Sequence, residues 1–198
     1  MGRVLIALVA ALMAVDFAAI AAPRAGAVVP SVRLIDLDSH PVDPFRAAAE
    51  AAAIVFLFAS VDCPISNRYA PVVQRLYERF SPEGVAFWLV YPNPAESAEA
   101  IREHVKAFGY PVHALRDPRH ELVKIARAAV TPEAAVFDRT RSLAYRGRLD
   151  DQYVSLGVAR PVPTRHDLVD AIAAILAGRP VREPVTPAVG CFISDFVR

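Results

Sequence analysis

The sequence predicts an α/β domain, because apolar runs that are typical of buried strands alternate with segments that have helical spacing. Residues 52–59 and 85–90 are continuous apolar runs, each suited to a strand that is buried on both faces of a sheet. Between them, residues 63–80 carry apolar side chains at helical spacing, and Pro71 is expected to kink this helix. We therefore expect a central mixed sheet flanked by helices.

The remaining elements follow the same alternation. Helix 117–128 is expected to begin with Asp117 as its cap and Pro118 at its first position, and Gly178 is expected to close the last helix. In chain order we predict a strand over 31–37, an Ala-rich helix ending near 53, a helix over 96–108, a strand over 111–115, a helix over 117–128, strands over 134–137 and 143–148, and a helix over 164–177. This pattern gives one domain over residues 28–178 and a C-terminal tail over 179–198, which is apolar enough to pack back on the domain.

Composition excludes several classes of protein. Of the 198 residues, 55% are hydrophobic, which is enough to bury a core and excludes wholesale disorder. The 22 basic and 21 acidic residues give a net charge of +1, which argues against nucleic-acid binding. The two cysteines, Cys63 and Cys191, exclude a disulfide-dense scaffold and any all-cysteine metal cluster.

The N-terminus reads as a signal peptide over residues 1–27. A positive start at Arg3 precedes the apolar run 4–15, and small-residue cleavage patterns follow at 19–21 and 25–27. Asp16 interrupts the apolar stretch and favours a cleaved signal over a membrane anchor; an uncleaved anchor and a buried helix are the other two interpretations. We expect a periplasmic or otherwise exported protein in an oxidising compartment, with no stable membrane insertion after cleavage.

Cys63 is the candidate nucleophile. It follows a buried strand and precedes Pro64, so it is expected to cap a helix and to be accessible, with its sulfur accepting hydrogen bonds from the amides of Ile65 and Ser66. Those amides, the helix dipole and the Ser66 hydroxyl would stabilise a thiolate, whereas the adjacent Asp62 would oppose it. The alternative is a small buried thiol that merely ends a strand.

These motifs resemble the thioredoxin-like superfamily, and within it the redoxins of the alkyl hydroperoxide reductase/thiol-specific antioxidant type. The resemblance covers roughly residues 30–178 and depends on the strand before Cys63, on Cys63-Pro64-Ile65-Ser66, and on Val130-Thr131-Pro132 before a later strand. It implies a thioredoxin-like fold, a redox-active Cys63, and a cis Thr131–Pro132 bond that faces this cysteine and leaves room for a substrate backbone.

Several positions depart from the motifs of related families. Ser66 replaces the second cysteine of C-x-x-C, and Asn67 stands where the C-x-x-x-C spacing of copper-assembly proteins needs a cysteine. In the peroxiredoxin-type pattern P-x-x-x-T-x-x-C, Ser60 can replace the threonine, but Phe56 replaces the proline, and no activating arginine precedes Thr131-Pro132.

Cys191 lies in an apolar segment of the tail, next to Gly190, which permits a close backbone approach. Three interpretations remain open. Cys191 resolves a disulfide with Cys63 during turnover, or it forms a permanent disulfide with Cys63 that fixes the tail, or the two thiols do not meet. An exported protein with two cysteines favours their pairing.

Other polar residues carry weaker signals. The five histidines show no metal-ligand spacing, and His120 and His166, at predicted helix starts, are expected to face solvent. The charged run 146–153 is expected to form a solvated turn with paired charges, the alternative being the wall of a groove.

The function we predict is that of an exported thiol–disulfide oxidoreductase, with Cys63, Cys191, Ser66 and Pro132 as its site residues. A thiol peroxidase and a copper-binding assembly protein are the alternatives, from an enzymatic and a non-enzymatic class. The expected partners are protein or small-molecule thiols and disulfides, with peroxide as the substrate of the peroxidase alternative. We predict no cofactor, no metal site and no nucleic-acid partner.

Overall fold

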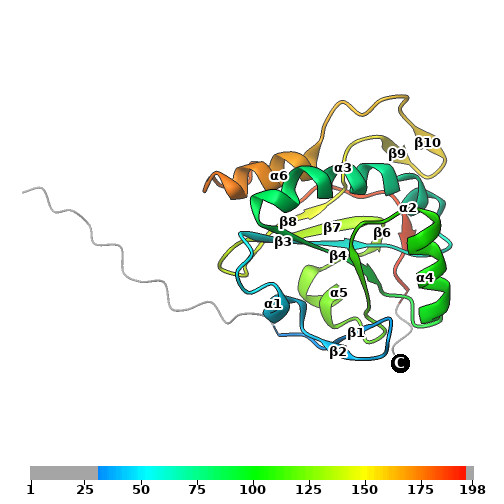
Figure 1. Ribbon diagram of the computed structural model, residues 1–198. Helices are drawn as coiled ribbons and strands as arrows, with labels where there is room; N and C mark the ends of the chain where they lie inside the picture. The colour runs from blue at the N-terminus through cyan, green and yellow to red at the C-terminus, as the bar shows by residue number, and fades with distance from the viewer. Residues whose placement is uncertain (1–30, 195–198) are drawn as a thin grey trace, which may run out of the picture.

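The computed structural model describes residues 31–194, so the predicted signal peptide over residues 1–27 lies outside the described residues. Seven strands form the central sheet, in the order β2-β1-β5-β4-β3-β7-β8 (Figure 1). The central strands β3 (Ala53–Phe58), β4 (Val85–Tyr91) and β5 (His113–Arg116) run parallel to one another. The flanking strands β1 (Leu34–Asp36), β2 (Pro41–Val42), β7 (Glu133–Phe137) and β8 (Leu143–Gly147) are paired antiparallel, which confirms the predicted mixed sheet.

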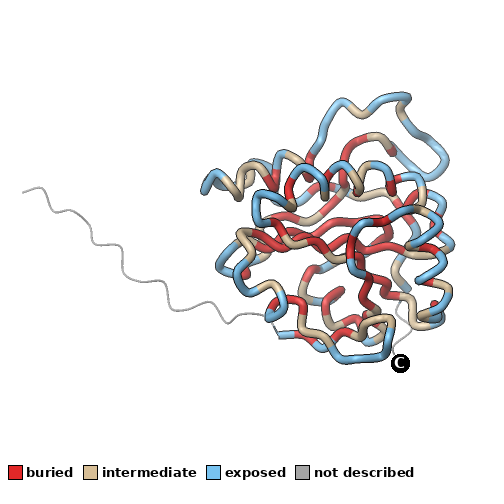
Figure 2. Tube along the Cα trace, viewed as in Figure 1, coloured by how far each residue is buried: buried red, intermediate tan, exposed pale blue. Residues whose placement is uncertain are grey.

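Helices cover both faces of the sheet, and the sheet itself is the buried centre of the molecule (Figure 2). All six residues of β3 are buried, as its uninterrupted apolar run predicts. Alternate residues of β3 belong to two core clusters, because successive side chains of a strand point to opposite faces. Helices α2 (Pro64–Arg68), α3 (Ala70–Phe80), α4 (Ala98–Ala107) and α6 (Asp167–Leu176) contribute to one cluster, and α1 (Pro44–Ala47) and α5 (Glu121–Ala126) to the other.

The predicted helix over 63–80 is broken into α2 and α3 at Tyr69, two residues before Pro71. A proline is tolerated in the first turn of a helix but not in its interior. The interruption predicted from Pro71 is therefore confirmed, and it leaves α2 as a short helix directly after Cys63.

Two predicted helices are shorter than expected. In the Ala-rich stretch only Pro44–Ala47 is helical, with Asp43 accepting hydrogen bonds from the amides of Phe45 and Arg46. Helix α5 begins at Glu121 and not at Pro118. The N-cap position is therefore His120 and not Asp117 as predicted, although the buried Asp117 carboxylate accepts the amides of residues 121, 122 and 123 in the first turn.

Short elements complete the described chain: the 3-10 turn Ser81–Glu83, β6 (Val130–Thr131), β9 (Tyr153–Ser155), β10 (Val158–Ala159) and β11 (Cys191–Phe192). After α6 the chain returns along β8, where Val185 forms a parallel bridge with Arg146. It then pairs β11 antiparallel with β6, so that the tail lies beside the strand that precedes Pro132 (Figure 1). No helix among residues 31–194 is both long and apolar enough to cross a membrane.

Candidate functional site

Cys63 occupies the N-cap position of α2, with Pro64 in the first turn, as the sequence predicts. Strand β3 delivers the chain to this position at the carboxyl edge of the parallel strands. The expectation that the Cys63 thiol is accessible is wrong, since Cys63 is only 1% exposed. Within the described chain, Cys191 of the C-terminal tail lies directly against its sulfur.

The Cys63 thiol makes a different hydrogen bond from the one expected. Its sulfur forms no capping bond with the amides of α2; instead the thiol donates to the carbonyl oxygen of Thr131, 3.0 Å away. The bond joins the start of α2 to the residue that precedes Pro132. The Thr131–Pro132 peptide bond is cis, as the resemblance implies.

Ser66 is positioned to respond when the Cys63 thiol loses its proton. Its hydroxyl is buried and, among residues 31–194, has no hydrogen-bond partner while the Cys63 thiol donates to Thr131. Burial raises the pKa of Cys63, but in the ionised form the Cys191 thiol and the amide and hydroxyl of Ser66 are donors to its sulfur, and they hold the pKa below its ordinary value. The Ser66 hydroxyl can therefore donate a hydrogen bond to the Cys63 sulfur once the thiolate has formed.

Cys191 is the second thiol of the site. Its thiol donates to the Cys63 sulfur across 2.9 Å, and both cysteines are free thiols in this structure. Partial burial, the hydrogen bond to Cys63 and the charge of the Cys63 thiolate raise the pKa of Cys191 to about 11. The pair therefore favours a thiolate at Cys63 and a protonated thiol at Cys191.

Gly190 allows the tail to approach this closely. A Cβ atom at position 190 would overlap the carbonyl oxygen of Thr131, which no side chain tolerates. The close contact sets the register in which Cys191 lies opposite Thr131 and Phe192 opposite Val130. Glycine is thus required here for space.

Glu96 holds the loop that leads to Cys63, and sequence analysis did not identify it. Its carboxylate accepts the Ser60 hydroxyl at 2.6 Å and the Val61 amide at 2.8 Å, while its second oxygen is buried with no partner among the described residues. Burial raises the pKa of Glu96, and these two hydrogen bonds only partly oppose the effect. Ser60, expected to substitute for a peroxidase threonine, therefore donates to Glu96.

A second buried network supports the same loop from α4. Asn67 donates its side-chain amide to the carbonyl oxygen of Val61, which leaves its Oδ1 to accept from Nε2 of His104 at 2.6 Å. Nδ1 of His104 then accepts from the Tyr91 hydroxyl at 2.7 Å. Burial lowers the pKa of His104, which agrees with this neutral tautomer. No local pattern predicts this network, because its members are far apart in the chain.

Two minor expectations are wrong. His120 is 1% exposed, and its Nε2 lies 2.9 Å from the carbonyl oxygen of Pro92. In the run 146–153, Asp150 and Asp151 are buried: Asp150 accepts from the Tyr69 hydroxyl, and Asp151 accepts from Thr164. The acidic side chains of this run hold segments together and do not form a solvated turn.

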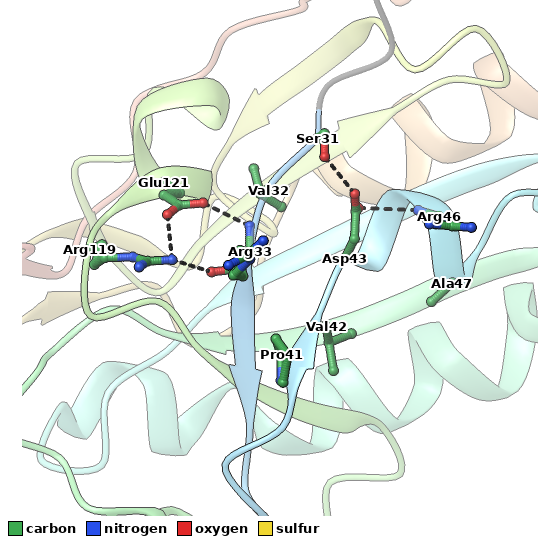
Figure 3. Close-up of a pocket in the computed structure, with 10 residues that line it drawn as sticks. All are labelled: Ser31, Val32, Arg33, Pro41, Val42, Asp43, Arg46, Ala47, Arg119 and Glu121. Atoms are coloured by element: carbon green, nitrogen blue, oxygen red, sulfur yellow. Dashed lines mark hydrogen bonds and ion pairs between the residues drawn. The ribbon is translucent and has the colours of Figure 1, made fainter.

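Two surface hollows differ in whether a cysteine lines them. A hollow of about 1010 Å³ is lined by Arg33, Arg46 and Arg119 together with Asp43 and Glu121, and neither cysteine lines it (Figure 3). Arg119 lies 2.7 Å from Glu121 and also donates to the backbone carbonyl of Arg33 (Figure 3).

A small hollow of about 90 Å³ is lined by Cys191 and Thr131, with Asn93, His120 and Phe192, but not by Cys63. Within residues 31–194, no three His, Cys, Asp or Glu side chains gather as metal ligands.

The sheet order, the thiol at the start of α2 and the cis proline beside it define a thioredoxin-like protein. The profile of the family Redoxin matches residues 24–155, and the chain belongs to this family. Its chemistry is, in general terms, thiol redox chemistry.

Solved structures agree with this assignment of the fold. An uncharacterized conserved protein from Geobacillus kaustophilus is 31% identical with a TM-score of 0.73, over 85% of this chain and 90% of its own. A hypothetical protein from Sinorhizobium meliloti is 28% identical with a TM-score of 0.71, over 85% and 92%. A secreted disulfide oxidoreductase of Mycobacterium tuberculosis shares the fold at 14% identity, with a TM-score of 0.51 over 75% and 96%. The search of curated proteins gave no match.

Proposed function

We propose that this chain is an exported thiol–disulfide oxidoreductase in which Cys63 is the nucleophile and Cys191 the resolving thiol. The observation that carries the proposal is the 2.9 Å separation of their sulfur atoms at the start of α2. In thiol–disulfide exchange, a second thiolate attacks a mixed disulfide and forms a new disulfide. At this distance Cys191 can attack a mixed disulfide on Cys63 within the same chain.

In the first step, the Cys63 thiolate attacks one sulfur of a substrate disulfide, and the other substrate sulfur leaves as a thiolate. Hydrogen bonds from Ser66 and Cys191 lower the Cys63 pKa in the closed site, and the Ser66 donors remain beside the thiolate when the tail moves. Since β11 covers Cys63 beside Pro132, this step requires the tail to move away from β6.

In the second step, Cys191 loses its proton and attacks the Cys63 sulfur of the mixed disulfide. The Cys63–Cys191 bond forms and the substrate leaves as a second thiolate. The charge of the Cys63 thiolate helps to raise the pKa of Cys191, and that charge is absent in the mixed disulfide. Cys191 therefore ionises more readily when its attack is required.

Export is the second part of the proposal. It is supported by the charged start, apolar run and small-residue cleavage patterns within residues 1–27. N-terminal sequencing of the protein after secretion from a bacterial host tests it: a new start after Ala21 or Ala27 supports export, and an intact Met1 contradicts a cleaved signal.

Matched variants test the thiol cycle. We expect Cys63→Ser to lose disulfide reduction, and Cys191→Ser to accumulate a mixed disulfide on Cys63. Arg182→Ala, an exposed change in the same tail, is the control and should keep full activity. Full activity in Cys63→Ser would contradict the proposal, and faster oxidation by hydrogen peroxide than by any disulfide would favour a thiol peroxidase.

A further inference from the structure

We propose that a thiol which reopens the Cys63–Cys191 disulfide attacks the sulfur of Cys191, so that the tail cysteine is the entry point for reducing equivalents. The inference deepens the proposed function and depends on it. It divides the cycle between two sulfurs: a disulfide substrate reacts at Cys63, and the reducing thiol reacts at Cys191.

The first argument is access. Cys63 is 1% exposed, whereas Cys191 is an exposed residue on β11. The hollow of about 90 Å³ next to the site has Cys191 in its wall and not Cys63. Phe192, which is 82% exposed, lies at the same hollow. While the tail is paired with β6, an external thiol therefore meets the Cys191 sulfur first.

The second argument is the leaving group. When a thiolate attacks a disulfide, the sulfur that is not attacked departs as a thiolate, and the thiol of lower pKa departs faster. When Cys191 carries the incoming thiol, the amide and hydroxyl of Ser66 still stabilise a departing Cys63 thiolate. When Cys63 carries it, burial still raises the pKa of a departing Cys191. Attack at Cys191 releases the stabilised ion, and attack at Cys63 would release the poorer leaving group.

The third argument is that the tail need not move. Cys191 is anchored opposite Thr131, and the Ile193 amide bonds the carbonyl of Ala129, so β11 stays in place while its cysteine reacts. The two halves of the cycle then differ in what they need from the tail. Substrate reduction at Cys63 requires the tail to open, and re-reduction at Cys191 does not.

The step balances as follows. A thiolate of the reductant, here glutathione, attacks the Cys191 sulfur; the Cys63–Cys191 bond breaks, and Cys63 leaves as a thiolate. A mixed disulfide between Cys191 and glutathione remains. A second glutathione thiolate attacks the glutathione sulfur, releases Cys191 as a thiolate that takes up a proton, and departs as oxidised glutathione.

Acid quenching tests the position of attack. The full chain, oxidised so that both cysteines are paired, is mixed with glutathione, quenched in acid at successive early times, and mapped by mass spectrometry. We expect the first adduct on Cys191, with Cys63 free, in at least about tenfold excess, the ratio that about 1.4 kcal/mol of preference gives. An adduct on Cys63, or equal amounts on both, would overturn the inference. If oxidation forms no Cys63–Cys191 disulfide, the proposed function itself fails, and the inference with it.

A charge placed in the hollow gives an independent test. Asn93 lies in the wall of the hollow, and its Oδ1 accepts the Ala95 amide, which an aspartate at this position also accepts. We expect Asn93→Asp to slow reduction by glutathione several-fold and reduction by 2-mercaptoethanol much less, because the glutathione thiolate also carries carboxylates, whereas the 2-mercaptoethanol thiolate has no other charge. Gln152→Glu, which adds the same charge outside the hollow, is the control. Equal rates for Asn93→Asp and the unaltered chain with glutathione would contradict entry through the hollow.

Discussion

Cys191 lies opposite Thr131 in the antiparallel pair of β11 and β6, and the Thr131 carbonyl also accepts the thiol of Cys63. The backbone of Thr131 thus contacts both cysteines of the site. The pairing places β11 beside the cis Pro132, where the resemblance leads us to expect room for a substrate backbone. The tail strand β11 therefore lies where a substrate backbone is expected. Its position controls both the access to Cys63 and the pKa of Cys63.

We expect Gly190→Ala to release β11 from β6, because the added methyl group would overlap the Thr131 carbonyl. Cys63 should then react with iodoacetamide at least about tenfold faster, since exposure of a covered thiol removes a barrier of more than about 1.4 kcal/mol. Alkylation rates of the reduced protein, assigned by peptide mapping, provide the measurement. Arg182→Ala serves as the tail control, and an unchanged rate in Gly190→Ala would show that the contact does not position the tail.

Removal of the Cys191 donor should raise the Cys63 pKa. A hydroxyl at position 191 can still donate to the Cys63 sulfur, whereas a methyl group cannot, so Cys191→Ala should titrate at higher pH than Cys191→Ser. Ultraviolet absorbance of the thiolate as a function of pH measures both variants. Identical titrations would mean that Cys191 does not stabilise the ion.

Ser66→Ala tests whether the Ser66 hydroxyl stabilises the Cys63 thiolate. Because the Ser66 hydroxyl has no partner among the described residues while Cys63 is protonated, its loss should weaken the thiolate without removing a bond from the neutral site. One hydrogen bond contributes about 0.5–1.5 kcal/mol, so the disulfide-reduction rate at neutral pH should fall roughly twofold to tenfold. The difference should vanish at high pH, where Cys63 is ionised in both proteins; a deficit that persists there would point to a packing defect.

Glu96→Gln should change the pH dependence of stability. Burial raises the pKa of Glu96 in the folded state, so its contribution to stability is complete in acid and is lost as the pH rises through the folded pKa. Relative to Glu96→Gln, the unaltered chain should therefore lose free energy of unfolding as the pH rises above about 4, the ordinary pKa of a glutamate. Urea denaturation measures this difference, and Glu99→Gln on the exposed side of α4 is the control. A difference that stays constant with pH would contradict a raised pKa for Glu96.

Much of the fold was predictable because its central strands have local sequence patterns that are typical of buried strands. The runs that form β3 and β4 are apolar without interruption, as strands buried on both faces must be. Cys63-Pro64 carries its own N-terminal helix signal, so the position of the candidate nucleophile was predictable too.

The contacts around Cys63 were not predictable, because they join residues that are distant in the chain. Nothing near Glu96 indicates that it holds Ser60, 36 positions away. The close approach at Gly190 depends on the register between β11 and β6, and two-residue strands leave no periodic pattern in the sequence. Sequence analysis therefore expected an open Cys63 and left the pairing with Cys191 unresolved.

The proposed cycle requires Cys63 and Cys191 to alternate between dithiol and disulfide during turnover. The most direct measurement is the redox state of both cysteines, mapped without prior reduction after equilibration in glutathione buffers of graded potential and again during turnover with a disulfide substrate. We predict one intramolecular Cys63–Cys191 disulfide that opens at a potential above about −300 mV and whose population changes with substrate. A bond that stays closed across this range, or a Cys63 that turns over while Cys191 remains a free thiol, would contradict the account.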